Sequence, residues 1–151
     1  MLKIEVTGTD AAAARLRELA ARGRDLSPVL KAFGQYKERQ VKLGFVEQRD
    51  PYGKAWKALK ESTLDRKRRL RKSLDILREN GDLRASISYE VTARSVIVGS
   101  TEDSPKPAVH QFGTSRAGRG RKTTIPARPW LAFTRGDEIE LVETIRAYFD
   151  S

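Results

Sequence analysis

His110 carries the side chain with the widest chemistry in this sequence, because an imidazole can transfer protons or bind a metal near neutral pH. The chain contains one histidine and no cysteine. A metal site or an activated nucleophile needs several such groups together, and no nearby carboxylate completes a pair with His110. We therefore expect His110, within the segment His110-Gln111-Phe112-Gly113, to cap or pack a short turn.

Two further patterns could support catalysis, but each has a simpler explanation. Glu138, Glu140 and Glu143 fall in a predicted amphipathic helix, where acids in the first turns complement the helix dipole. Residues 118–120 lack the flanking strand and helix of a phosphate-binding loop. We therefore expect no catalytic residue, no metal, no cofactor and no small-molecule substrate, and hence no enzyme.

A dense basic run in the middle of the chain contains Arg66, Lys67, Arg68, Arg69, Arg71 and Lys72. On a predicted helix these residues surround the axis, so some of their aliphatic stems must cover apolar surface near Leu70. One interpretation is a stripe that binds nucleic acid. The run has no interleaved aromatic residues for stacking and no recognised DNA-binding motif beside it. We therefore favour a solvated helix face or a contact with an acidic subunit.

A second basic segment, residues 114–124, contains no acid, and its cations are Arg116, Arg119, Arg121 and Lys122. Ordering a loop with so many glycines costs conformational entropy, so we expect it to be mobile in isolation. It could be an idle connector. Because a loop of this length in a compact domain more often has a function, we favour a loop that contacts a partner protein or DNA.

The composition predicts a single domain over residues 1–151. Hydrophobic residues make up 38% of the chain, charged residues make up 33%, and the formal net charge is +10. These values favour a small core with exposed arms and a polyanionic or acidic partner. No apolar run approaches the roughly 20 residues that cross a bilayer, so we expect a soluble protein, made in the cytosol, without membrane contact.

The apolar patterns predict an α+β fold, with three to four helices packed on a small, mainly antiparallel sheet. Strands are predicted at residues 2–6, 87–92 and 95–99, the last two as an antiparallel pair. Helices are predicted from a cap at Thr9 or Asp10 to about Arg22, and from Ser27-Pro28 to about Leu43. A last helix is predicted to begin at a Thr134 cap.

A third helix is predicted to open at a Ser62–Asp65 capping box and to stop at Asn80-Gly81. It would bury three leucines, Leu70, Leu74 and Leu77. Before it, Asp50-Pro51-Tyr52-Gly53 predicts a tight turn, because proline presets one dihedral angle and glycine admits a positive one.

Several short motifs follow one another between about residue 26 and residue 150. They are Pro51-x-Gly53-x-x-Trp56-x-x-Leu59, Thr63 and Lys67, Leu77 followed by Gly81-x-Leu83-x-x-Ser86-Ile87, Val98-Gly99-Ser100, His110-Gln111-Phe112-Gly113 and Ile125-Pro126-Ala127-Arg128-Pro129-Trp130-Leu131. Their order and spacing resemble the phage virion morphogenesis family, also called tail completion, of Mu-like phages and prophages.

The resemblance implies a structural, non-enzymatic protein that completes the tail or joins it to the head. It implies a place in the virion, with assembly in the bacterial host cytoplasm, and other tail or head–tail connector proteins as partners. We expect a homo-oligomeric ring built by heterologous contacts, with non-specific contact to passing DNA. The alternative is a sequence-independent nucleic-acid-binding protein.

The motif residues are expected to be structural anchors rather than parts of a reaction site. Among them, the large aromatic side chains of Trp56, Phe112 and Trp130 are expected to hold the fold. The full set of expected anchors is Pro51, Gly53, Trp56, Gly81, Leu83, His110, Gln111, Phe112, Gly113, Pro126, Arg128, Pro129 and Trp130.

Overall fold

A computed structural model describes residues 3–6, 10–21 and 25–150 of the chain. Leu2 of the predicted first strand, the cap at Thr9 and the helix end at Arg22 lie outside these ranges. The described elements are β1 (Lys3–Val6), α1 (Asp10–Ala21), α2 (Ser27–Glu47), α3 (Glu61–Arg69), α4 (Asp82–Ala85), β2 (Ile87–Val91), β3 (Val96–Ser100), α5 (Lys106–Phe112), β4 (Thr114–Ala117), β5 (Thr123–Ile125) and α6 (Arg135–Asp150). The predicted α+β class is confirmed: α1, α2, α3 and α6 are the longer helices, and α4 and α5 are short.

The larger sheet is antiparallel throughout, with the strand order β1-β3-β2. Tyr89 lies opposite Val98, and Val91 lies opposite Val96, so the predicted pairing of these two strands is confirmed. The connection is a tight turn in which the Ser95 carbonyl accepts the Thr92 N–H at 2.9 Å. Val96 and Val98 of the central strand β3 are buried, and α2 packs against both β2 and β3.

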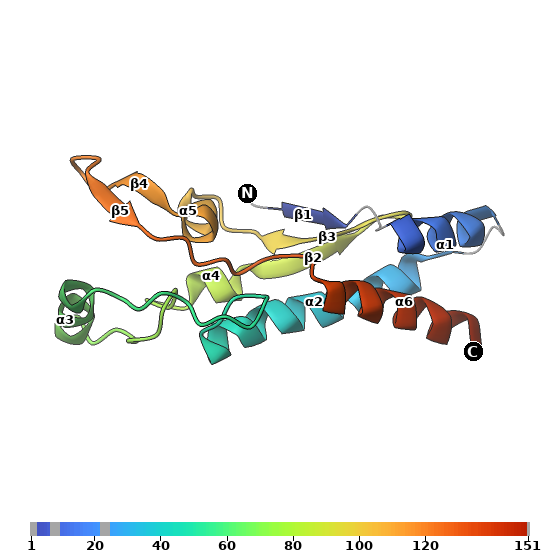
Figure 1. Ribbon diagram of the computed structural model, residues 1–151, viewed down its shortest axis with the longest axis horizontal. Helices are drawn as coiled ribbons and strands as arrows, with labels where there is room; N and C mark the ends of the chain where they lie inside the picture. Colours follow the sequence, from blue (N-terminus) through green and yellow to red (C-terminus); the bar gives the residue numbers. More distant parts are fainter. Residues whose placement is uncertain (1–2, 7–9, 22–24, 151) are drawn as a thin grey trace.

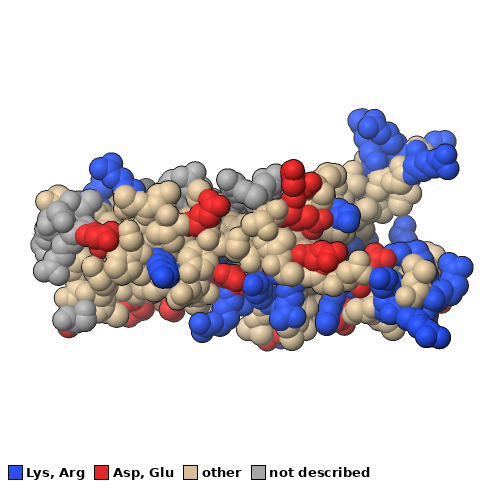
Figure 2. Space-filling model, turned by 180° about the vertical axis from the view of Figure 1, so that it is seen from behind, with Lys and Arg blue, Asp and Glu red and all other residues tan. Residues whose placement is uncertain are grey.

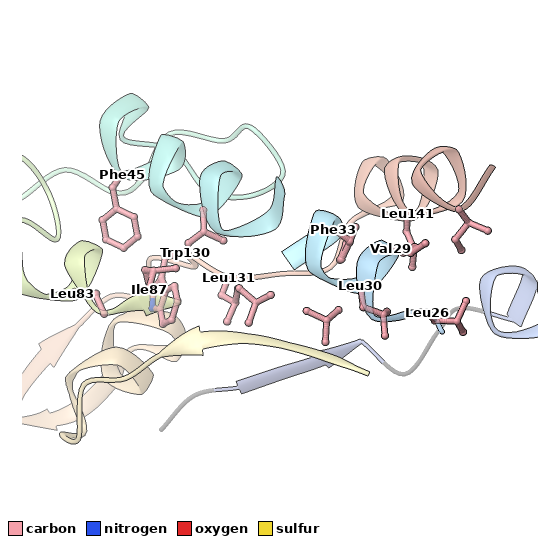
Figure 3. Packing of buried hydrophobic residues seen from close by; sticks show 14 of the residues in the cluster. Leu26, Val29, Leu30, Phe33, Phe45, Leu83, Ile87, Trp130, Leu131 and Leu141 are labelled. Atoms are coloured by element: carbon pink, nitrogen blue, oxygen red, sulfur yellow. The ribbon is translucent and has the colours of Figure 1, made fainter. Parts of the chain in front are cut away.

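The core runs along α2, which packs against the sheet on one side and against α6 on another (Figures 1 and 3). Phe33 in the middle of α2 is fully buried. Its ring packs edge-on against that of Phe133, with 6.2 Å between the ring centroids. Gly34 allows the closest approach of α2 to β2, because a Cβ atom at this position would lie 2.3 Å from the ring of Tyr89. Helix and sheet are therefore in direct contact at this point.

A buried ion pair joins α2 to the start of α6. The Lys37 ammonium donates to the Asp137 carboxylate at 2.6 Å, and both residues are buried. The same carboxylate accepts the backbone N–H of Thr134 at 2.7 Å, so the predicted helix start at Thr134 is confirmed. Neither residue of this pair was predicted to interact, although Lys37 lies four residues from both Phe33 and Val41 on the apolar face of α2.

The predicted start of α2 at Ser27 is confirmed, but its predicted cap and the predicted extent of α3 were wrong. Ser27 does not cap α2 with its side chain; instead its N–H donates to the Asp25 carboxylate at 2.9 Å. α3 begins at Glu61 without a side-chain cap and ends after Arg69, well short of residue 77. Leu70 and Leu74 are consequently 54% and 46% exposed rather than buried.

Candidate partner interface

At the end of the molecule opposite α1 and the C-terminus, two arms project side by side from the body (Figure 1). We call residues 57–81, which include α3, the helical prong, and residues 113–127, which include β4 and β5, the hairpin prong. Together they form the fork, and the rest of the chain is the body. A cleft of about 410 Å³ lies between the prongs. Residues of both basic segments line this cleft. So do motif residues from two parts of the chain, Leu59 to Leu83 and His110 to Arg128.

The positive charge of the protein is concentrated on the fork. The helical prong carries nine lysines and arginines against four acids, and the hairpin prong carries four against none. The prongs therefore have net charges of +5 and +4, which leaves +1 for the body out of a total of +10. Lysine and arginine side chains accordingly gather on both arms in Figure 2, whereas the rest of that face shows both signs of charge.

The side chain of Gln111 in α5 joins the two chain segments at the base of the hairpin prong. Its amide oxygen accepts the backbone N–H groups of Trp130 and Leu131 at 3.0 and 3.1 Å, and its amide nitrogen donates to the Leu131 carbonyl at 2.7 Å. One side chain thus satisfies three backbone groups of the strand-like segment that leads to α6. The indole N–H of Trp130 adds a bond to the Pro107 carbonyl at 3.0 Å.

The helical prong is fastened to the same segment by Arg128 and Trp56. The buried Arg128 guanidinium donates to the carbonyls of Lys57 and Ala58 at 2.7 and 3.1 Å. The Trp56 indole N–H donates to the Pro129 carbonyl at 2.7 Å, and the backbone N–H of Arg128 donates to the His110 carbonyl at 2.7 Å. Residues 128–131 therefore hold the bases of both prongs, and we call them the clasp.

Gly113 makes the crossing of the two chain segments possible. It has a φ of 71°, and a Cβ atom there would lie 2.7 Å from the Ala127 nitrogen and 2.8 Å from the Ile125 carbonyl oxygen. Both the positive φ and the backbone contact favour glycine over any residue with a side chain. The backbone geometry thus explains why glycine occupies the last position of the His110-Gln111-Phe112-Gly113 segment.

Residues 114–124 form a β-hairpin where the sequence suggested a loop without regular structure. β4 and β5 pair antiparallel, with Thr114 opposite Ile125 and Ala117 opposite Thr123, and a bulge lies between these pairs. Arg121 donates its N–H to the Gly118 carbonyl at 3.0 Å to close the turn. Within the described chain, the four predicted contact residues form no ion pair: Arg116, Arg119, Arg121 and Lys122.

Lys67 shapes the helical prong and explains why α3 ends early. Its ammonium donates to the carbonyls of Ser73, Asp75 and Arg78 at 2.8, 2.8 and 2.9 Å. Three donors meet three acceptors, and the side chain is buried, which lowers the pKa of the Lys67 ammonium. The chain after Leu70 therefore wraps around Lys67 instead of continuing the helix, and Lys67 does not belong to the predicted exposed basic face.

The other members of the basic run differ in how they are engaged. Arg66 pairs with Glu79 at 2.7 Å, while Arg68 contacts Glu61 and Asp65 at 2.9 Å each. Lys72 donates to the side-chain oxygen of Asn80. Arg69 and Arg71 are exposed and form no ion pair within the described residues. The run is thus partly internal scaffolding of the prong and partly free charge.

His110 lies at the floor of the cleft, where its Nδ1 atom is buried without a hydrogen-bond partner in the described structure. Burial lowers the pKa of His110, and the positive charges of Arg128 and Lys106 lower it further, whereas Glu102 opposes them. The imidazole is therefore held in its neutral form near neutral pH.

No group of three or more metal-ligating side chains occurs within the described residues. No described helix is long and apolar enough to cross a membrane.

Several of the expected anchors are built into the fold, whereas Phe112 is not. Trp56, Leu83 and Trp130 are buried, and Gly53 and Gly81 both have a φ of 86°. Arg128 belongs to the clasp, and Gln111 binds it from α5. Gly53 closes the predicted turn, in which its N–H reaches the Asp50 carbonyl at 3.0 Å. Gly81 precedes α4 instead of ending α3. Phe112 is 67% exposed, so the prediction that it holds the fold is wrong.

Comparison with known proteins now identifies the family. The family model described as "Phage virion morphogenesis family" matches residues 7–150. The chain belongs to this family. Mu-like prophage FluMu G protein 2 of Haemophilus influenzae is similar to it, with 34% identity over 149 residues, covering 99% of this chain and 96% of that protein. No solved structure is significantly similar to the chain.

Membership of the virion morphogenesis family assigns the chain a role in building a phage or prophage particle. The fork differs from the rest of the molecule in its charge and shape. It offers unpaired positive charge on two arms and a cleft between them. The clasp joins both arms to the body.

Proposed function

We propose that this protein is a structural assembly protein that completes the phage tail or joins it to the head, and that it acts through protein–protein contacts made by the fork. The observation that carries the proposal is the division of charge: the two prongs hold nine of the ten net positive charges of a virion morphogenesis protein. Charge arranged in this way guides docking and selects an acidic partner more than it stabilises the fold.

The proposed partners are other tail or head–tail connector proteins, and further copies of this chain. A ring of copies would place one subunit's fork against its neighbour in a heterologous contact that closes on itself. In this proposal the protein performs no catalysis. It joins the particle in the host cytoplasm and remains at the head-proximal end of the tail.

The test is genetic complementation followed by negative-stain electron microscopy. Particles made without the protein should appear as separate heads and tails, and the wild-type chain should restore joined, infectious particles. Complete infectious particles in its absence would overturn the proposal.

Replacing the four hairpin cations, Arg116, Arg119, Arg121 and Lys122, with serine sharpens the test. The free energy of unfolding of the variant should lie within about 0.5 kcal/mol of the wild-type value, since exposed substitutions away from packed features have small effects. It should nevertheless fail to restore joined particles. A variant that unfolds would show that these side chains hold the hairpin instead of contacting a partner.

A second candidate function is sequence-independent nucleic-acid binding, favoured by the unpaired cations at both prongs. Binding to duplex DNA would then weaken with salt, with a log–log slope of about −0.9 for each neutralised phosphate. The quadruple serine variant should reduce the magnitude of this slope by about one for each removed cation that reached a phosphate. An unchanged slope would exclude the hairpin prong as a DNA contact.

A further inference from the structure

The cleft between the prongs has walls of mixed character. Leu59 and Leu77 of the helical prong face Ile125 and Pro126 of the hairpin prong, and Leu83 and His110 contribute to the floor. The volume of about 410 Å³ lies within the roughly 300–1,000 Å³ typical of ligand pockets. Apolar walls of this kind suit side chains better than phosphates, because interfaces with nucleic acid are strongly polar.

The strand that borders the cleft has an unused edge. In the described part of the chain β5 pairs with β4 alone, and all three β5 residues, Thr123, Thr124 and Ile125, line the cleft, whereas no β4 residue does. An exposed strand edge offers backbone N–H and C=O groups to an incoming extended chain. The opposite edge, along β4, lies outside the cleft.

The charges in and around the cleft determine which kind of chain would enter. Its lining is net positive, with six cations against three acids: Lys60, Arg66, Lys67, Arg78, Lys106 and Arg128 against Glu79, Asp82 and Glu102. The hairpin cations Arg116 to Lys122 lack internal partners in the described structure, as do Arg69 and Arg71 on the helical prong. Cations that are not neutralised internally attract acidic groups and repel basic ones. These cations lie on the two prongs but outside the lining of the cleft, and they add to the positive charge around it.

We infer that the cleft binds an extended acidic segment of a partner virion protein, which lies along the free edge of β5. One or two of its apolar side chains enter between Leu59 and Ile125, and its carboxylates face the cations of the prongs. This inference rests on the proposed assembly role and adds to it the chemistry of the partner segment.

The test uses the full chain and a fluorescein-labelled peptide of alternating glutamate and valine, with fluorescence anisotropy as the readout. The key variant is Thr124→Asp, which places a negative charge on the exposed cleft wall. The matched control is Ser115→Asp, which adds the same charge to the exposed face of the same hairpin outside the cleft. Equal melting temperatures of the two variants and the wild type establish that all three are folded.

We expect the alternating peptide to bind the wild type and Ser115→Asp with similar affinity, and Thr124→Asp to bind it about tenfold more weakly. Backbone amide resonances of Thr123 to Ile125 should shift on binding. The inference is overturned if both variants weaken binding equally, or if a glutamate-only peptide of the same length or a short DNA duplex binds as tightly, because charge alone would then explain the result.

The particle assay distinguishes a failure of the peptide-binding inference from a failure of the assembly role. If no peptide binds but the quadruple serine variant still fails to join heads to tails, the assembly role stands and the assigned occupant of the cleft is wrong. If particles are complete without the protein, the assembly role fails whatever the peptide does. A Thr124→Asp variant that restores particles as well as Ser115→Asp would also count against the occupant.

Discussion

The body and the fork are held together by different interactions. Every fully buried apolar residue of the described chain lies in the body, from Leu26 to Ile145, and the one buried residue of the two prongs is Lys67. The body therefore follows the usual rule of a hydrophobic core. The fork is organised by polar side chains that bind backbone carbonyls and N–H groups, and this leaves its surface free to carry charge.

This difference suggests why a small protein can project two highly charged arms. Like charges on one arm repel, and they cannot be gathered inside a core without a large desolvation cost. Here each arm is short, is fastened at its base by the clasp and is shaped by a few hydrogen bonds. The interior of the body therefore holds little charge, and the ion pair it does contain, between Lys37 and Asp137, is buried.

The largest expected contrast comes from truncating one phenylalanine in each region. Phe33→Ala removes a fully buried ring from the body and should lower the free energy of unfolding by about 3–5 kcal/mol. Phe112→Ala removes a ring beside the fork that is 67% exposed. This variant should change the free energy of unfolding by less than about 0.5 kcal/mol. Chemical denaturation of both variants checks the pair, and similar losses would show that Phe112 is packed after all.

A smaller, local effect is expected inside the helical prong. Lys67→Met leaves three carbonyls without their donor and should destabilise residues 70–80 by about 1–3 kcal/mol. Hydrogen exchange should therefore quicken in this segment while the amides of α2 and β3 keep their protection.

Lys72→Met is the matched control for that variant, because the Lys72 ammonium reaches a side-chain oxygen and no backbone carbonyl. It should leave exchange in residues 70–80 nearly unchanged. Equal effects of the two methionine variants would mean that the loss of a positive charge, and not of the carbonyl contacts, loosens the prong.

The smallest effect concerns His110 and pH. Because burial lowers the pKa of His110 in the folded chain, the unfolded chain takes up a proton near the ordinary value of about 6.5 while the folded chain remains neutral. Stability is therefore lost as pH falls below about 6.5, and this contribution levels off below the folded pKa. His110→Gln, which cannot titrate, should show a shallower fall in melting temperature between about pH 7.5 and pH 5.5.

A parallel pH dependence of the two melting temperatures would refute this role of His110. Acidic groups such as Glu79, whose pKa is lowered mainly by its hydrogen bonds with Arg66, contribute to acid sensitivity in both proteins. Their stabilising effect is lost as pH falls through the lowered pKa. The comparison of wild type and variant removes this shared part.

Local patterns predicted the body well, because its elements depend on neighbours in sequence. The alternation of Tyr89 and Val91 against Val96 and Val98 predicted the antiparallel pairing of β2 and β3, and the Thr134 cap depends on Asp137 three residues later. The turn at Asp50 to Gly53 likewise needs only its own residues. In each case the interacting groups are close enough in the chain to be recognised from spacing.

The fork was predicted less well because its structure depends on contacts that spacing does not reveal. Nothing in a run of six cations distinguishes Lys67, whose partners are carbonyls of a segment predicted as helix. The hairpin has a bulge and few apolar residues, so it lacks the alternation of an ordinary strand pair. The motif containing Phe112 was recognised, but which of its side chains packs inward depends on how α5 is oriented.

The clasp also limits how the length of this chain can vary. Arg128 reaches the helical prong, while Trp130 and Leu131, two and three residues later, reach α5. The number of residues between these positions therefore sets the distance between the bases of the two arms. An added residue in the turn at 118–122 would merely lengthen an arm, whereas one added between Arg128 and Trp130 would release one arm or the other.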